Sequence, residues 1–161
     1  MCEYHAIAAL PDRTMVFDEL CHGCGSCALM CPERAIREVP IATGVIETGR
    51  ANGLSFAQGT LELGEAMATP VIRELKHLAE REGWDQGGWV VIDAPPGNAC
   101  PVIEALRGAD VALLVTESTP FGLHDLRLAV TVARDVLKLN VGVVINKDVP
   151  EHAEVDEYCA E

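Results

Sequence analysis

Apolar residues follow different patterns in successive parts of the chain. In residues 39–64, short runs that alternate valine, isoleucine, leucine and phenylalanine are separated by glycines, which predicts a β-hairpin connector. From Thr69 to about Glu82, apolar residues recur at the spacing of one helix face, and Pro70 suits the first helical position. A helix is therefore predicted directly after the connector.

Three wholly apolar runs follow this helix, in "GGWVVIDAPPG" (87–97), "DVALLVTES" (110–118) and "LNVGVVINKD" (139–148). Such continuous runs are typical of strands buried on both faces of a parallel sheet. Because a helical pattern over residues 121–138 separates the second run from the third, this part is predicted to be an open α/β sheet. Ligands of such sheets bind beyond the carboxyl ends of the strands, where "DAPPG", "TESTP" and "NKD" stand.

The composition indicates a globular chain of about one domain. Its 161 residues are 49% hydrophobic, which is enough for a sizeable core. The net charge of −13 argues against nucleic acid as a partner. No apolar run is long enough for a membrane span and no secretory signal opens the sequence, so we expect a cytoplasmic protein without a membrane span.

Five of the seven cysteines lie in the first 31 residues. Cys21, Cys24, Cys27 and Cys31, followed by Pro32, have the spacing of a bacterial 4Fe-4S ligand run, and "RTMVFDEL" before them predicts a short strand. This clustering in a cytoplasmic chain indicates metal rather than disulfides. Zinc is the weaker alternative, because zinc ligands commonly come as two well-separated pairs.

A fifth cysteine, Cys2, bears on which four thiols hold the cluster. In two-cluster ferredoxins the first three cysteines of a run bind one cube and the fourth crosses to the other. The stretch "CEYHAI" parallels "CPERAI" from Cys31, so Cys2 resembles the fourth cysteine of an upstream run. We therefore predict one cube on Cys2, Cys21, Cys24 and Cys27. Cys31 would face a second cluster whose other ligands are missing from this chain.

Three further residues carry weaker signals. Cys100 and Cys159 stand alone in the sequence, and a lone cysteine is commonly a small buried apolar residue. We expect burial for both. His22 stands between two predicted ligands, and we expect it at the surface rather than as a hydrogen-bonding partner of the cluster.

The segments "VVIDAPPGNACPV", "TESTPFGLHDLRLAV" and "VGVVINKD", together with the cysteine run, resemble the MinD-like P-loop ATPases that carry an inserted ferredoxin domain. These are relatives of ParA, of the Mrp-type iron-sulfur carriers and of the nitrogenase iron protein. The resemblance implies part of a P-loop NTPase-type parallel α/β sheet with helices, plus a small ferredoxin-like α+β module. The expected divisions are a cluster module (1–36), a β-rich connector (37–66) and a nucleotide-binding α/β domain (67–161).

The same resemblance implies ATP and magnesium as cofactors of the intact protein and gives roles to three residues. Asp93 matches the acid that organises magnesium and the attacking water near the terminal phosphate. Gly97 matches a switch position whose backbone amide senses that phosphate. Asn146 matches the residue whose side-chain amide reads the adenine edge, and Val149 stands where a guanine-reading pattern has aspartate.

One part of the family pattern is missing: no glycine in the chain is followed by lysine, so the phosphate-binding P-loop is absent. The last residues, "EVDEYCAE", read as the start of another helix. We therefore expect an internal piece of a longer protein, with Met1 an internal methionine, and no ATP hydrolysis by this chain alone.

These features predict a 4Fe-4S protein in which ATP switches electron transfer or the handling of iron-sulfur clusters in the intact protein. The alternative is a passive ferredoxin-type electron carrier whose α/β part is a scaffold. The expected partners are a redox or iron-sulfur protein and, from the resemblance, a second copy in a nucleotide-dependent homodimer.

Overall fold

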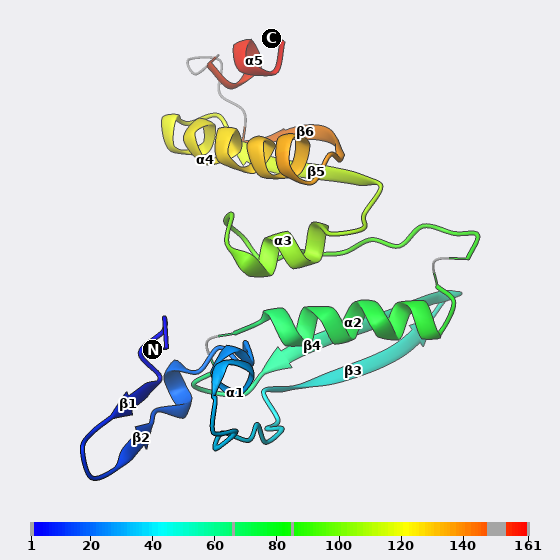
Figure 1. Cartoon of the computed structure of the whole chain (residues 1–161). Helices are drawn as coiled ribbons and strands as arrows, with labels where there is room; N and C mark the ends of the chain where they lie inside the picture. Colours follow the sequence, from blue (N-terminus) through cyan, green and yellow to red (C-terminus); the bar gives the residue numbers. More distant parts are fainter. Residues whose placement is uncertain (1, 66, 85, 148–153, 161) are drawn as a thin grey trace. The chain divides into compact units, whose positions relative to one another are not determined.

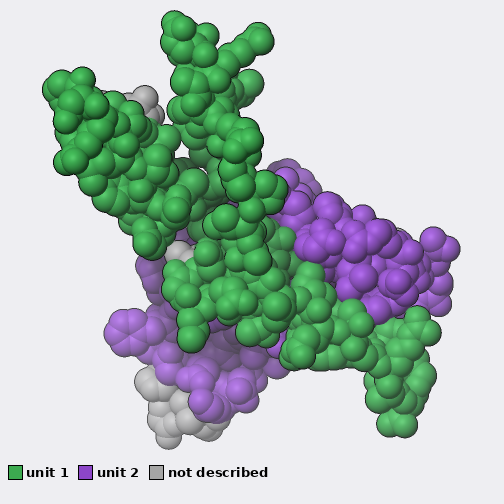
Figure 2. Space-filling view, turned by 90° about the horizontal axis from the view of Figure 1, so that it is seen from below, with its two compact units in different colours: residues 1–71 green, residues 72–161 purple. Residues whose placement is uncertain are grey.

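A computed structural model describes residues 2–65, 67–84, 86–147 and 154–160. The chain forms two compact units, residues 1–71 (unit 1) and 72–161 (unit 2), which Figure 2 colours separately. Among the described residues, unit 1 holds two antiparallel strand pairs and unit 2 holds one parallel pair. Figure 1 follows these elements along the chain.

The first hairpin of unit 1 leads into the cysteine run. Strand β1 (Ile7–Ala9) pairs antiparallel with β2 (Thr14–Val16). A 3₁₀ turn, η1 (Asp18–Leu20), follows, and the short helix α1 (Ser26–Met30) comes next. Strand β2 confirms the short strand predicted before the ligand run.

The second hairpin confirms the predicted glycine-rich connector strands. Strands β3 (Gly44–Ala51) and β4 (Leu54–Leu61) pair antiparallel along their whole length. Asn52 and Gly53 join them with φ angles of 52° and 79°. A two-residue hairpin turn of type I′ needs both residues in this left-handed region, and Asn-Gly adopts it at low cost.

A lysine of helix α2 (Thr69–Arg81) donates hydrogen bonds to the end of helix α3 (Cys100–Leu106). Helix α2 confirms the predicted helix, and the short helix α3 follows later in the chain. Lys76 Nζ donates to the Glu104 carbonyl at 2.9 Å and to the Arg107 carbonyl. The last carbonyls of a helix lack partners within the helix, so Lys76 satisfies the end of α3 from α2.

The strand–helix–strand arrangement predicted for unit 2 is present. Strands β5 (Val111–Glu117) and β6 (Asn140–Asn146) run parallel along their full length. They are connected by α4 (Pro120–Val130), which continues into the π-helical segment η2 (Thr131–Val136). The predicted helix between the second and third apolar runs is therefore confirmed, with a change of helical geometry in its last part.

The hydrophobic core of unit 2 is built around α4. Leu126 and Val130 of α4 pack with Val155 of α5 (Glu154–Ala160), and these three side chains are 3%, 6% and 1% exposed. Partly buried residues of both strands pack against this cluster, so α4 covers one face of the parallel pair. Helix α5 confirms the helix predicted at the end of the sequence.

The strand predicted in "GGWVVIDAPPG" is wrong. Residues 89–95 have no regular secondary structure, and Trp89 and Val91 are 95% and 89% exposed. A strand exists only by hydrogen bonding to a neighbour. Within the described part of the chain, β5 pairs with β6 alone, and residues 89–93 pair with no strand. An apolar run is thus insufficient to form a strand without a partner.

The described residues form a mixed α/β chain with small sheets. The larger P-loop NTPase-type sheet and the divisions at residues 36 and 66 stay predictions. No helix within the described ranges combines the length and apolar character needed to cross a bilayer.

Candidate iron-sulfur site

The cysteine run turns sharply around two glycines. Gly23 and Gly25 have φ angles of 58° and 71°, in the left-handed region that glycine adopts without strain. They stand on either side of Cys24, and Gly25 also caps the N-terminus of α1. Cys27 lies in the first turn of that helix. The backbone therefore changes direction on both sides of Cys24 and re-enters a regular helix just before Cys27.

Cys31 lies immediately after α1 and is half-buried. Its Sγ accepts a hydrogen bond from the Ala35 backbone N–H at 3.3 Å. The Arg34 N–H donates to the Cys31 carbonyl at 3.1 Å, which holds this turn closed. Backbone donors of this kind stabilise a sulfur that carries negative charge, as an iron-bound thiolate does.

The Cys24 thiol is exposed and lies 3.5 Å from Ser26 Oγ. A hydrogen bond with the Ser26 side chain, and to a smaller extent one with the Ser26 backbone, lowers the pKa of Cys24 below its ordinary value. The thiolate is the form of cysteine that binds metal. The local structure therefore favours the ligand form of Cys24.

Cys2 lies at the start of a turn that contacts the ligand run. The His5 N–H donates to the Cys2 carbonyl at 3.1 Å, and His5 has a φ of 55°. The Tyr4 ring, inside this turn, stacks on the His22 ring with the centroids 3.6 Å apart and the planes 10° apart. Cys2 is thus attached through Tyr4 to the loop that carries Cys21.

The cysteines fit the ligands of an iron-sulfur cluster. Their thiols form no disulfides, the backbone turns sharply between them, and hydrogen-bonding groups lie beside two of the sulfurs. Where the structure describes the chain, however, no three His, Cys, Asp or Glu side chains gather as a ready-made metal site. The ligand set Cys2, Cys21, Cys24 and Cys27, and the orientation of Cys31 toward a second cluster, therefore stay predictions.

Two of the residues that the sequence predicts to face the nucleotide lie in the irregular segment before α3. Gly97 has a φ of 97°, so glycine is required where this segment turns. Asp93 is exposed and does not end a strand, since the strand predicted before it is not formed. The magnesium role of Asp93 and the switch role of Gly97 stay predictions.

Asn146 stands at the carboxyl end of β6, opposite Glu117 at the end of β5. Its Oδ1 accepts a hydrogen bond from the Lys147 N–H at 3.0 Å. Lys147 Nζ in turn lies 2.6 Å from Glu117 Oε1, and this carboxylate raises the pKa of Lys147. The adenine-reading role of Asn146 stays a prediction, and its side-chain oxygen is engaged by the local backbone.

The Lys147–Glu117 ion pair was not foreseen from the sequence. The sequence does contain a signal for it, because Glu117 and Lys147 stand at the equivalent ends of two consecutive parallel strands. The carboxyl ends of such strands meet at one edge of the sheet. The ion pair therefore joins two of the three segments that were predicted to border a ligand.

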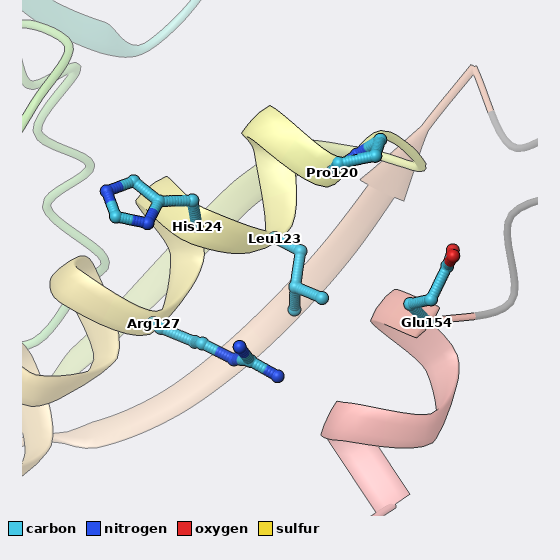
Figure 3. A pocket seen from close by; sticks show the side chains of 5 residues that line it. All are labelled: Pro120, Leu123, His124, Arg127 and Glu154. Carbon is cyan, nitrogen blue, oxygen red and sulfur yellow. The ribbon is translucent and has the colours of Figure 1, made fainter.

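A pocket of about 320 Å³ lies between α4 and the start of α5 in unit 2. Figure 3 shows the Arg127 side chain extending from α4 toward α5, while the His124 ring is directed away from Glu154. The Arg127 guanidinium lies 5.3 Å from the centre of the Tyr158 ring. The remaining lining side chains are Pro120 and Leu123. Arg127 is thus already engaged by Tyr158 of α5.

The weaker sequence signals have mixed outcomes. Cys100 and Cys159 are exposed, so the expected burial is wrong for both. Cys100 is the first residue of α3, and Cys159 is the last but one of α5. His22 is exposed, as predicted, and it also carries the ring stack with Tyr4.

Comparison with known proteins supports the cluster site. Residues 15–37 match the family of 4Fe-4S binding domains, and this range contains the run Cys21–Cys31. The uncharacterized protein MJ0579 of Methanocaldococcus jannaschii is 28% identical over 91% of this chain and 52% of its own length. The uncharacterized protein MJ0578 of the same organism is 35% identical over 49% of this chain and 28% of its own length.

A third relative is a cytosolic Fe-S cluster assembly factor, the NUBP2 homolog of Culex quinquefasciatus. It is 35% identical over 45% of this chain and 30% of its own length. This chain thus spans about half the length of MJ0579 and less than a third of the other two relatives. No solved structure matches the chain.

Together, the domain match and the cysteine geometry support an iron-sulfur protein of the 4Fe-4S type. They favour iron over the zinc alternative, because the matched domain is one that binds 4Fe-4S clusters. Membership of the MinD/ParA ATPases stays a prediction.

Proposed function

We propose that this chain is the cluster-bearing part of a MinD/ParA-type ATPase, in which ATP switches electron transfer or iron-sulfur cluster handling. The observation that carries the proposal is the ligand run Cys21–Cys31, folded around left-handed glycines inside a matched 4Fe-4S domain. The bound cluster would accept and release single electrons or be passed to another protein. Its partner would be a redox protein or a recipient of clusters.

The likeness to the NUBP2 homolog supports cluster handling over passive electron transfer. It covers 45% of the chain, far more than the short cluster domain at residues 15–37, so most of the matched part lies in other segments. A plain electron carrier needs no such segments. The parallel pair β5–β6 supplies a sheet edge of the kind that borders nucleotides.

Asp93, Gly97 and Asn146 are the residues of this chain proposed to face ATP and magnesium. The left-handed Gly97 fits a loop that must approach a phosphate closely. A phosphate-binding loop with its lysine must come from elsewhere, since the chain has no Gly-Lys pair. ATP hydrolysis and a nucleotide-dependent homodimer are therefore proposed for the whole protein.

ATP titration of the cluster potential separates the two functions. In the whole protein, loaded anaerobically, the switch predicts a reduction potential that shifts when ATP and magnesium are added. A passive carrier predicts one potential with and without ATP. Asp93→Asn should keep nucleotide binding while removing most ATP hydrolysis, and equal loss of both would point to misfolding instead.

The isolated chain provides the complementary test. It should hydrolyse no ATP above background, because the phosphate loop is missing. Turnover by this chain that Asp93→Asn abolishes would contradict the assignment and mean that another segment cradles the phosphates.

A further inference from the structure

The Tyr4–His22 ring stack has no role in a hydrophobic core. Tyr4 is 43% exposed and His22 is also exposed, yet their planes are within 10° of parallel at a centroid distance of 3.6 Å. Aromatic pairs contribute roughly 0.5–1.5 kcal/mol beyond the area that they bury. That energy is small for overall stability, but it favours the arrangement in which Tyr4 lies against His22.

Both rings stand beside predicted ligands. Tyr4 lies two residues after Cys2, inside a turn closed by a 3.1 Å backbone hydrogen bond onto the Cys2 carbonyl. His22 directly follows Cys21, whose N–H donates to the Asp18 carbonyl at 3.0 Å. The stack therefore connects the Cys2 turn to the residue that directly follows Cys21.

The backbone ladder alone does not reach Cys2. The Phe17 N–H donates to the Ala6 carbonyl at 2.9 Å, which extends the β1–β2 pairing by one further bond. Residues 2–5 lie beyond this ladder. Among the contacts that the structure describes, the ring stack is the one that attaches these residues to the ligand run.

We propose that Tyr4 and His22 are positioning residues that present the Cys2 thiol to a cluster held by the run Cys21–Cys27. This inference rests on the proposed function, because it requires a 4Fe-4S cluster with Cys2 as the fourth ligand. The two rings contact no iron; they restrict where the Cys2 turn can lie. Partners that orient metal ligands commonly change metal affinity by about 10- to 100-fold when they are removed.

The test uses the full chain reconstituted anaerobically with iron and sulfide. Tyr4→Leu should release iron to a chelator about tenfold faster than the unaltered chain, because the fourth ligand is no longer held in place. It should also give the electron paramagnetic resonance signal of a three-iron cluster after mild oxidation. Tyr4→Phe, which keeps the ring, should behave as the unaltered chain. Tyr158→Leu, at the other tyrosine of the chain, is the matched control and should leave the cluster unchanged.

The link to Cys2 is tested by combining substitutions. In a Cys2→Ala background, Tyr4→Leu should add no further loss, since the ligand that it positions is already gone. Proton NMR of the iron-free chain should show His22 ring signals shifted by the Tyr4 ring, and Tyr4→Leu should remove that shift. This readout needs no cluster.

Two results would overturn the proposal in different ways. A loaded chain whose iron release is the same with Tyr4→Leu overturns the positioning role and leaves the proposed function intact. An unaltered chain that takes up no iron overturns the proposed function and the positioning role with it.

Discussion

Unit 1 and unit 2 differ in what holds each of them together. Among the described residues of unit 1, Ala6 alone is buried, at 2% exposure. Leu29 and Met30 of the cluster-side helix α1 are 85% and 77% exposed. Hairpins and turns define this unit, and small folds without a sufficient core commonly depend on a metal or a disulfide. We expect the cluster to act as the missing core of unit 1.

Unit 2 has an apolar core of its own. Leu126, Val130 and Val155 pack together, and Ala133 of η2, which continues α4, is fully buried. This core contains no predicted iron ligand. From this difference we expect cluster binding and sheet packing to be separable in this chain, so that each can be disturbed without the other.

The largest effect on amide protection is expected when the chain is prepared without its iron-sulfur cluster. Without iron, the amides of β1, β2 and α1 should exchange with solvent faster than in the loaded chain, because the binding energy of the cluster adds to the stability of a unit with little core of its own. The amides of β5 and β6 should keep their protection. Hydrogen exchange followed by mass spectrometry measures the protection of the amides in both units. If the iron-free chain lost protection in unit 2 together with unit 1, the two units would not differ in what holds them together.

Substitution of single cysteines tests which four thiols hold the cluster in unit 1. Cys2→Ala should lower the iron content far below the value of about four per cluster, whereas Cys31→Ala should leave most of it. The physical reason is that Cys2 completes the predicted cube and Cys31 does not. Iron and sulfide analysis of both variants decides the matter. A larger loss with Cys31→Ala would reverse the assignment.

A core substitution tests unit 2 alone. Leu126 is 3% exposed, so Leu126→Ala should cost about 2–5 kcal/mol of unfolding free energy through lost burial and a cavity. The matched control is Leu128→Ala on the same helix, where the side chain is 40% exposed and the cost should be much smaller. Denaturant unfolding measures both. Cluster absorbance that falls with Leu126→Ala before unit 2 unfolds would show the units to be coupled.

The smallest effect concerns an ion pair between α2 and α3. Arg73 Nε lies 3.2 Å from Glu104 Oε1, and this hydrogen bond lowers the pKa of Glu104. Because the pKa of Glu104 is lower in the folded chain, its ion pair stabilises the fold at pH values above the ordinary carboxyl pKa. This stabilisation is lost as the pH falls through the lowered pKa. Arg73→Gln should therefore destabilise unit 2 near neutral pH, by at most about 1 kcal/mol because Arg73 is largely exposed, and have no effect in strong acid.

The control for this pair is Arg81→Gln. Arg81 lies 2.8 Å from Glu74, but both side chains are more than half exposed to solvent. Arg81→Gln should change the unfolding free energy less than Arg73→Gln does, because the partner of Arg73 is only 12% exposed. Thermal unfolding at several pH values compares them, and an equal loss at every pH would rule out the titration of Glu104 as the cause.

Local signals in the sequence predicted most of the elements. The Asn52-Gly53 pair defines its hairpin by backbone preference alone, and the helical spacing after Thr69 defines α2. The cysteine spacing indicated the cluster site, and the domain match at residues 15–37 supports it. These signals succeed because each acts within a few residues.

Signals that depend on distant partners were less reliable. The apolar run at residues 89–92 has the composition of a strand, but pairing requires a neighbour that composition does not reveal. The Tyr4–His22 stack and the Lys147–Glu117 pair join residues far apart in sequence, so neither follows from local pattern. The change to π-helix at Thr131 was likewise unforeseen.

Metal analysis of anaerobically purified chain tests the central claim most directly. A 4Fe-4S cluster in unit 1 predicts about four irons and four sulfides per chain, with a visible absorbance that bleaches on reduction with dithionite. Colourless protein, or protein that holds zinc in place of iron and sulfide, would contradict the account.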